Sequence, residues 1–215
     1  ILTKATPFYG ESGGQAGDLG KAFNTNVQLE ITDTTKPVPE LIAHHAKVFR
    51  GSIKKGDAIT LQVDTITRQN TALNHTSTHL LHAALKAVLG DHVKQAGSLV
   101  TPDRLRFDYS HFSPLAEKEK SRIESIVNEE IRKNTDVLTQ EKSIQEALDD
   151  GATALFGEKY GDSVRVVSVP GFSKELCGGT HISATGDVGI FKIISEGSVA
   201  SGVRRIEAIT GSAAL

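Results

Sequence analysis

Two histidines four residues apart are the first residues in this sequence whose spacing suggests chemistry. His75 and His79 fall in a segment of helical periodicity, where positions i and i+4 lie on one face, so two imidazoles can reach one metal ion. A glutamate directly after the first histidine is typical of zinc proteases, but Thr76 stands there and the general base is missing. Taken alone, the pair favours an ordinary surface or core position over a ligand role.

A second pair of ligand types follows much later in the chain. Cys177 and His181 are separated by Gly178, Gly179 and Thr180, and the glycines suit a tight turn that brings backbone close to an ion. Thiolate and imidazole are both zinc ligands, whereas the usual alternative for a lone cysteine is a buried, unreactive thiol. The presence of both pairs in one chain favours one shared zinc. Its expected ligands are His75, His79, Cys177 and His181.

The remaining histidines lack such a pattern. His82 follows His79 by three residues and faces the same way, so it could compete as a ligand. We expect it to lie beyond the ion, either behind the ligands or facing solvent. We expect structural or exposed positions for His44, His45, His92 and His111.

The composition is that of a globular protein. The chain has 215 residues, of which 38% are hydrophobic and 23% charged, with one cysteine, no methionine and a net charge of −2. A disulfide within the chain is excluded, and weak intrinsic affinity for RNA is expected because there is no bulk positive charge. No apolar run is long enough to span a bilayer. The start at Ile1 and the lack of a targeting segment favour an excised piece of a longer cytoplasmic protein.

The first part of the chain predicts a small β-module. Residues 1–66 are rich in glycine and other turn formers, and short alternating runs predict strands at 27–31, 42–48 and 58–63, with a loop at 34–39. We interpret residues 1–66 as a small β-barrel or β-sandwich.

After this module the periodicity changes to that of a helix. Asp64 or Thr67 can cap a helix that runs to Leu89, and a second helix is expected from Pro114 to Lys133. Further strands are predicted in one sheet, at 93–100, 105–109, 164–169, 188–194 and 203–209. Helices and strands alternate without βαβ regularity, so the fold class of the second domain is α+β.

Motifs along nearly the whole chain give a specific resemblance. The chain resembles the editing region of alanyl-tRNA synthetase, the related free-standing alanyl-tRNA editing proteins and, more distantly, the editing domain of threonyl-tRNA synthetase. The matching stretches, in the order of the family, are 6–15 (TPFYGESGGQ), 74–82 (NHTSTHLLH), Leu99 with 104–108 (RLRFD), 154–160 (ALFGEKY), 175–181 (ELCGGTH) and 202–208 (GVRRIEA).

This resemblance implies two domains and a reaction. Residues 1–66 would form a glycine-rich β-barrel module, and residues 67–215 a zinc-dependent α+β editing domain. The reaction would be hydrolysis of the ester that joins a wrong amino acid, serine or glycine, to the 3′ end of the tRNA for alanine. The parent chain would add an aminoacylation domain, which uses ATP, and a C-terminal domain; no part of this chain resembles the class II catalytic core.

The resemblance also carries site residues over to this sequence. The zinc ligands would be His75, His79, Cys177 and His181, and the active-site residues Thr78, Gln95 and Arg204. Four protein ligands are typical of a structural zinc, whereas hydrolytic zinc keeps one position open. Either one of the four ligands is weakly bound and yields its place, or the ion only orients the substrate amino group or water, and we favour the second.

Structural roles stay open as alternatives for several of these residues, and other functions stay open for the chain. Gln95 could be an exposed polar residue of a strand. Arg204 and Arg205 would point to opposite faces of a strand, and a salt bridge to Glu207 or Glu196 is as well favoured as a contact with tRNA. The chain could also be a free-standing trans-editing deacylase, or a zinc-stabilised tRNA-binding module without chemistry.

Overall fold

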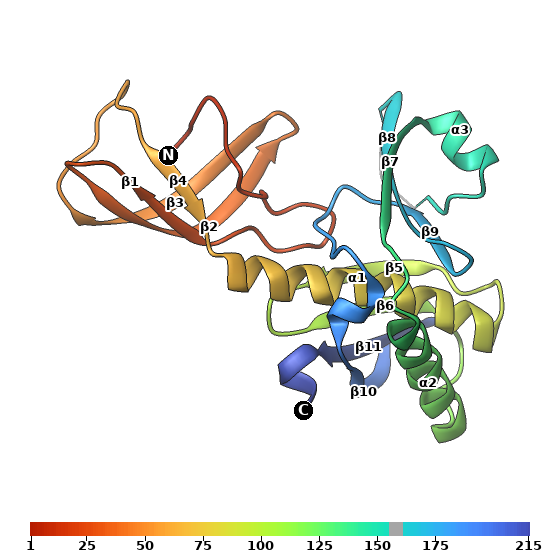
Figure 1. The fold of residues 1–215 in the computed structure, drawn as a ribbon. Coiled ribbons are helices and arrows are strands. Elements are labelled where there is room, and N and C mark those ends of the chain that lie inside the picture. The colour runs from red at the N-terminus through yellow and green to blue at the C-terminus, as the bar shows by residue number, and fades with distance from the viewer. Residues whose placement is uncertain (155–160) are drawn as a thin grey trace.

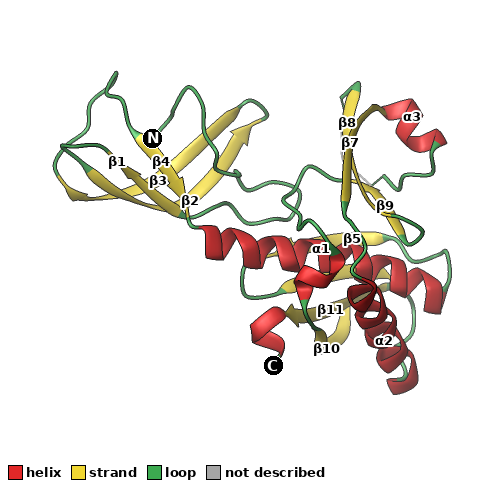
Figure 2. Cartoon of the chain, in the orientation of Figure 1, coloured by secondary structure: helices red, strands yellow, loops and turns green. Residues whose placement is uncertain are grey.

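A long helix joins three separate β-sheets in the computed structural model of this chain, which describes residues 1–154 and 161–215. In Figure 1 the first sheet and the third sheet stand above opposite ends of this helix, and the second sheet lies behind and below it. Most of the predicted motif at 154–160 lies outside the described residues. Secondary structure is marked along the same view in Figure 2.

The first sheet is antiparallel and open. Its order is β3 (Leu41–Arg50), β2 (Gln28–Val38), β1 (Gly20–Phe23) and β4 (Thr60–Val63), so β3 and β4 are its edges. A small core of Phe8, Ala22, Val27, Leu29 and Ile31 packs against one face.

Two predictions for this region are wrong. The expected β-barrel is not formed by residues 1–66, because the edge strands do not pair with each other and the sheet stays open. The expected loop at 34–39 is strand up to Val38, and the pairing of β2 with β3 is irregular between Thr35 and Val38, where Pro37 has no N–H to donate.

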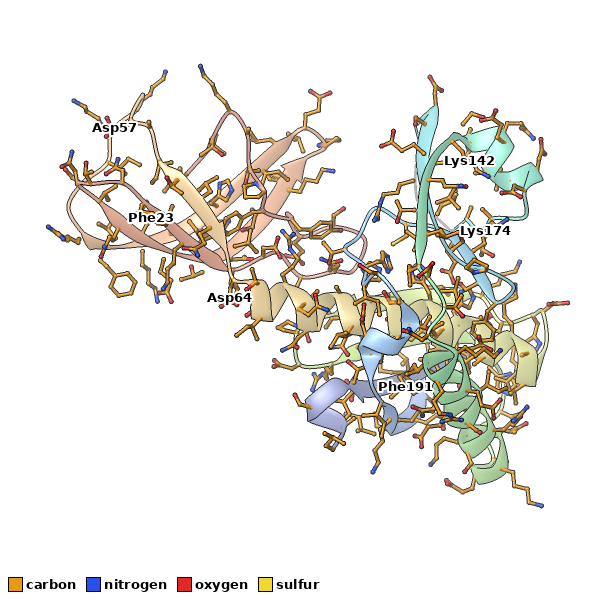
Figure 3. All side chains as sticks on the ribbon, viewed as in Figure 1. Phe23, Asp57, Asp64, Lys142, Lys174 and Phe191 are labelled. Carbon is orange, nitrogen blue, oxygen red and sulfur yellow. The ribbon has the colours of Figure 1, made fainter. Side chains whose placement is uncertain are left out.

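The helix α1 (Thr65–Leu89) leaves the first sheet at Asp64, which is labelled in Figure 3. The Asp64 carboxylate accepts hydrogen bonds from the N–H groups of Ile66 (3.1 Å) and Thr67 (3.0 Å), and Gly90 follows the last turn with a φ of 108°. The helix boundaries therefore confirm the prediction. Its middle turns are buried, which places His75 and His79 inside the molecule.

The second sheet packs with α1 and α2 around the main core. Its order is β10 (Phe191–Ala200), β11 (Val203–Thr210), β6 (Leu105–Ser110) and β5 (Gln95–Val100). The largest wholly buried side chains of this core include Leu80, Phe107, Ile123, Phe191 and Ile206, and Phe191 is labelled in Figure 3.

The helix α2 (Glu117–Lys133) begins later than predicted. Pro114 precedes it, and the carboxylate of Glu119 accepts from the backbone N–H of Ala116 at 2.8 Å, which fixes the first turn at Glu117. The helix ends at Asn134, whose φ of 51° lies in the left-handed region.

The third sheet was not predicted as a separate unit. It contains β7 (Leu138–Ser143), β8 (Ser163–Val169) and β9 (Ser173–Leu176), and the helix α3 (Ile144–Asp149) lies beside it. The segment 164–169 was expected in one sheet with the other strands, but it pairs with β7 and β9 instead. Two short 3-10 helices, at Thr185–Val188 and Gly211–Ala214, complete the described elements.

None of the helices in the described part of the chain is long and apolar enough to cross a membrane.

Candidate metal centre

The four metal ligands predicted from the sequence lie close together where the end of β9 approaches α1. His75 and His79 lie on the buried face of α1, and β9 ends at Leu176, directly before Cys177. One ligand atom from each of His75, His79, Cys177 and His181 lies within 4.8 Å of the others. This group could therefore hold a metal ion.

The distances within the group fit zinc. Sγ of Cys177 lies 3.4 Å from Nε2 of His75 and 3.2 Å from Nε2 of His181. Two ligands of one tetrahedral zinc, with bonds of about 2.0–2.3 Å, stand roughly 3.3–3.6 Å apart. Three imidazoles and one thiolate are also a donor set that zinc accepts.

The ligand turn, residues 177–181, is held in place by hydrogen bonds to Arg165 of β8. The N–H of Cys177 donates to the carbonyl of Arg165 (2.9 Å), and the Arg165 guanidinium donates to the carbonyls of Cys177 (3.0 Å) and Gly179 (2.5 Å). The N–H of Gly179 points at Sγ of Cys177 from 3.4 Å. Four polar contacts thus fix the path of the turn between the thiol and His181.

The pKa values of Cys177 and His181 favour the protonation states in which these two side chains bind metal. Burial raises the pKa of the Cys177 thiol, but the charges of His75 and His79 outweigh it and hold this pKa well below its ordinary value. Burial and the neighbouring His75 lower the pKa of His181 to about 3, so its imidazole is neutral at pH 7. Thiolate and neutral imidazole are the forms that bind metal.

His79 differs from these two side chains. Burial lowers its pKa, but the carboxylate of Glu175 and the thiolate of Cys177 raise it to about 9. An ion that binds His79 must therefore displace a proton at neutral pH.

Polar side chains contact the Nδ1 atoms of His75 and His181, on the side of each ring away from Cys177. Nδ1 of His75 lies 2.7 Å from Oε1 of Gln15, and Nδ1 of His181 lies 3.0 Å from the hydroxyl of Thr76. His82 is buried and its Nδ1 lies 3.0 Å from a carboxylate oxygen of Glu175, so of the two positions left open it takes the one behind the ligands.

A pocket of about 410 Å³ opens beside the group. Thr78 and Gln95 both line it, as do His75, His79 and Cys177. The Thr78 hydroxyl donates to the carbonyl of Asn74 (2.9 Å), one turn back along α1. Two of the three predicted active-site residues therefore lie beside the candidate ligands.

Arg204 lies elsewhere. It is buried, and its Nε and Nη2 are both 2.6 Å from Oε1 of Glu196, one of the salt bridges expected as an alternative. Arg205 points to the other face, where it binds Asp108 at 2.7 and 2.8 Å. Arg204 and Gln95 are both in register with Tyr109, so they share one face of the second sheet. A contact between Arg204 and substrate stays a prediction.

The other histidines take structural or exposed positions, as expected. His44 is buried, and its ring contacts the carbonyl of Ile1 (3.1 Å) and the hydroxyl of Thr6 (2.8 Å). His45 is exposed. His92 is exposed, and its Nε2 lies 2.9 Å from Nδ1 of His111, a contact that the sequence did not suggest.

Comparison with known proteins gives matches along the chain. Residues 164–207 match the model of the threonyl and alanyl tRNA synthetase second additional domain, and residues 1–67 match that of the class II (A) tRNA synthetases. The second match is an outcome that the motifs did not predict, since we expected no resemblance to the class II catalytic core.

Individual relatives match from end to end of this chain. It is 58% identical over 215 residues to the alanine–tRNA ligase of Desulfosudis oleivorans and 55% identical to that of Xanthomonas campestris pv. campestris. It is 54% identical to that of Carboxydothermus hydrogenoformans. The chain spans only 24–25% of the length of these relatives.

The α+β fold carries a largely buried His/Cys group that could hold a metal, and part of the chain is similar to a domain of threonyl and alanyl tRNA synthetases. Over its whole length, the chain matches a segment of alanine–tRNA ligase.

Proposed function

We propose that this chain is the editing segment of an alanine–tRNA ligase and hydrolyses the ester of serine or glycine attached in error to the tRNA for alanine. One observation carries the proposal. The pocket of about 410 Å³ is lined both by side chains that could hold a metal ion and by Thr78 and Gln95.

The selectivity of amino-acid pockets explains why such a site is needed. An apolar pocket shaped for alanine cannot exclude the smaller glycine, and it rejects an added hydroxyl only by about 10². Polar groups placed for the serine hydroxyl would be left unpaired by alanine, and sites of this kind can discriminate by about 10⁴. Steric exclusion of the alanine methyl group would serve for glycine.

We propose zinc as the resident ion, held by His75, His79, Cys177 and His181. When bound, a zinc ion supplies positive charge that orients the amino group of the substrate or a water molecule. All four ligands come from the protein, which supports an orienting rather than a water-activating ion.

The other residues of the pocket would position the reacting groups. The Gln95 amide does not titrate, so its role is to hold water or substrate by hydrogen bonds. The Thr78 hydroxyl donates to Asn74, which leaves its lone pairs to accept a hydrogen bond from the substrate. Arg204 would act from the face of the second sheet that it shares with Gln95.

The partner that follows from this proposal is the 3′ end of a mischarged tRNA. The expected division into a β-module at 1–66 and an editing domain at 67–215 remains part of the proposal, as do the aminoacylation and C-terminal domains of the parent chain and its place in the cytoplasm.

A zinc-stabilised tRNA-binding module is the second candidate. The observation that favours it is the complete set of four protein ligands, which is typical of structural zinc. It predicts binding of tRNA without turnover.

Replacement of the thiol tests both candidates. We expect Cys177→Ala to lower both the zinc content and the hydrolysis of serine esterified to the tRNA for alanine, because it removes the one thiolate of the group. The matched control is His45→Ala, which removes an exposed histidine outside the group. Zinc is measured by elemental analysis and hydrolysis by release of serine from the same sample. Retention of zinc and activity in Cys177→Ala would refute the shared site, and a zinc-loaded parent without turnover would favour the binding module.

A further inference from the structure

Gln15 connects the glycine-rich N-terminal segment to the candidate metal centre. Its side chain is wholly buried, and one atom, Oε1, makes two contacts. It lies 2.7 Å from Nδ1 of His75 and 2.8 Å from the backbone nitrogen of Thr180. One atom thus contacts both ligand-bearing segments, α1 and the turn between Cys177 and His181.

These two contacts decide which ring nitrogen of His75 carries the proton. The backbone N–H of Thr180 can only donate, so the Gln15 atom that faces it must be the carbonyl oxygen. This oxygen can only accept, so Nδ1 of His75 must donate to it. In the neutral ring, Nε2 then carries the lone pair, on the side where Sγ of Cys177 lies at 3.4 Å.

We infer that Gln15 is a positioning residue of the metal centre, which holds His75 in the tautomer whose Nε2 can bind the ion. The inference rests on the proposed metal site. Ligating histidines are commonly oriented by an acceptor at their other ring nitrogen, and loss of that acceptor typically weakens metal binding 10–100-fold.

The backbone around Gln15 is fixed to the second sheet. The N–H of Ala16 donates to the carbonyl of Val100 (2.9 Å), and the N–H of Val100 donates to the carbonyl of Gly14 (2.7 Å). Gly14 has a φ of 81°, and a Cβ there would lie 2.6 Å from the carbonyl oxygen of Ser98, so only glycine fits. The segment before the first sheet is therefore part of the frame of the site.

The contact at His181 is less restrictive. The Thr76 hydroxyl, 3.0 Å from Nδ1 of His181, can donate or accept, so it does not select a tautomer. The contact with Gln15, by contrast, assigns one tautomer to His75.

Three variants test the inference. Gln15→Ala removes the acceptor, Gln15→Glu keeps an acceptor oxygen at the same reach, and Gln28→Ala removes an exposed glutamine of the first sheet as the matched control. Zinc affinity is measured by competition with a chromophoric chelator. We expect Gln15→Ala to bind zinc about 10–100-fold more weakly than the parent, and Gln15→Glu and the control to bind close to it.

A second measurement needs no metal. Nitrogen-15 NMR of the His75 ring, in metal-free protein at a pH where this ring is neutral, shows which nitrogen is protonated. We expect Nδ1–H in the parent and a shift towards Nε2–H in Gln15→Ala. Thermal unfolding of the metal-free variants separates this effect from a general loss of stability.

The outcomes distinguish this inference from the proposed function. Unchanged zinc affinity in Gln15→Ala, or equal loss in Gln15→Ala and Gln15→Glu, would overturn the inference. A parent that binds no zinc would overturn the proposed metal site, while the ring measurement would still decide the tautomer.

Discussion

At the scale of single residues, Gly179 leaves no room for a side chain between the ligand turn and His75 of α1. A Cβ at this position would lie 2.0 Å from Cε1 of His75 and 2.8 Å from Oε1 of Gln15. We expect Gly179→Ala to displace the His75 ring and to weaken zinc binding at least as much as loss of an orienting contact, about 10–100-fold. Chelator competition measures this effect.

The neighbouring glycine provides the control for this prediction. A Cβ at Gly178 would meet no atom within 4 Å, so Gly178→Ala should bind zinc like the parent. Equal affinities for the two variants would show that the close approach of Gly179 to His75 is not needed for the site.

The candidate ligands could be predicted from the sequence, but the residues that hold them could not. His75 and His79 share a helix face, and Cys177 and His181 flank one turn, so local spacing was sufficient. Gln15 reaches His75 across 60 positions of the chain, a contact that depends on how two segments pack. The glycines beside Gln15 marked this segment only as rich in turn formers.

At the scale of elements, the start of α1 depends on the Asp64 carboxylate. Its bonds to the N–H groups of Thr67 and Ile66 lower the pKa of this exposed side chain below its ordinary value near 3.8. The carboxylate therefore stabilises the fold fully above that value, and its contribution is lost as the pH falls through the lowered pKa.

Two substitutions test the cap. Asp64→Ala should lower the free energy of unfolding at pH 7 by about 1 kcal/mol, whereas Asp64→Asn should leave it nearly unchanged, because asparagine also caps helices. In acid, where the wild-type carboxyl becomes protonated, the asparagine variant should lose less stability than the parent. Urea unfolding at pH 7 and below pH 4 measures both effects, and identical acid profiles for the two proteins would contradict the role of the carboxylate.

Elements with a clear period or cap were predicted well, and polar strands were missed. The helix α1 carries an apolar stripe between Asp64 and Gly90, so both of its ends were found. The strand β7 reads Leu-Thr-Gln-Glu-Lys-Ser and is mostly exposed, so no alternation marks it. The third sheet could not be foreseen, because its pairing depends on this strand.

At the scale of the whole molecule, the candidate metal centre joins α1 to the turn that follows the third sheet. A metal that binds only the folded chain stabilises it by about 4 kcal/mol when its free concentration is 1,000 times Kd. For a chain of this length each kcal/mol changes Tm by about 2–4 °C, so a chelator should lower Tm by roughly 8–16 °C.

The control for this experiment is Cys177→Ala, whose Tm should respond much less to the chelator because it lacks the thiolate. Calorimetry with and without chelator measures both proteins. Equal responses of the parent and the variant would mean that the stabilising ion binds elsewhere.

The open form of the first sheet leaves an edge where another chain can attach. On one side β3 pairs with β2; on its other side Ile1 contacts the backbone of His44. Farther along β3, Val48 and Phe49 are exposed, by 57% and 70%. A strand edge with apolar side chains promotes pairing between molecules, so concentrated samples of the chain should self-associate through this end of β3.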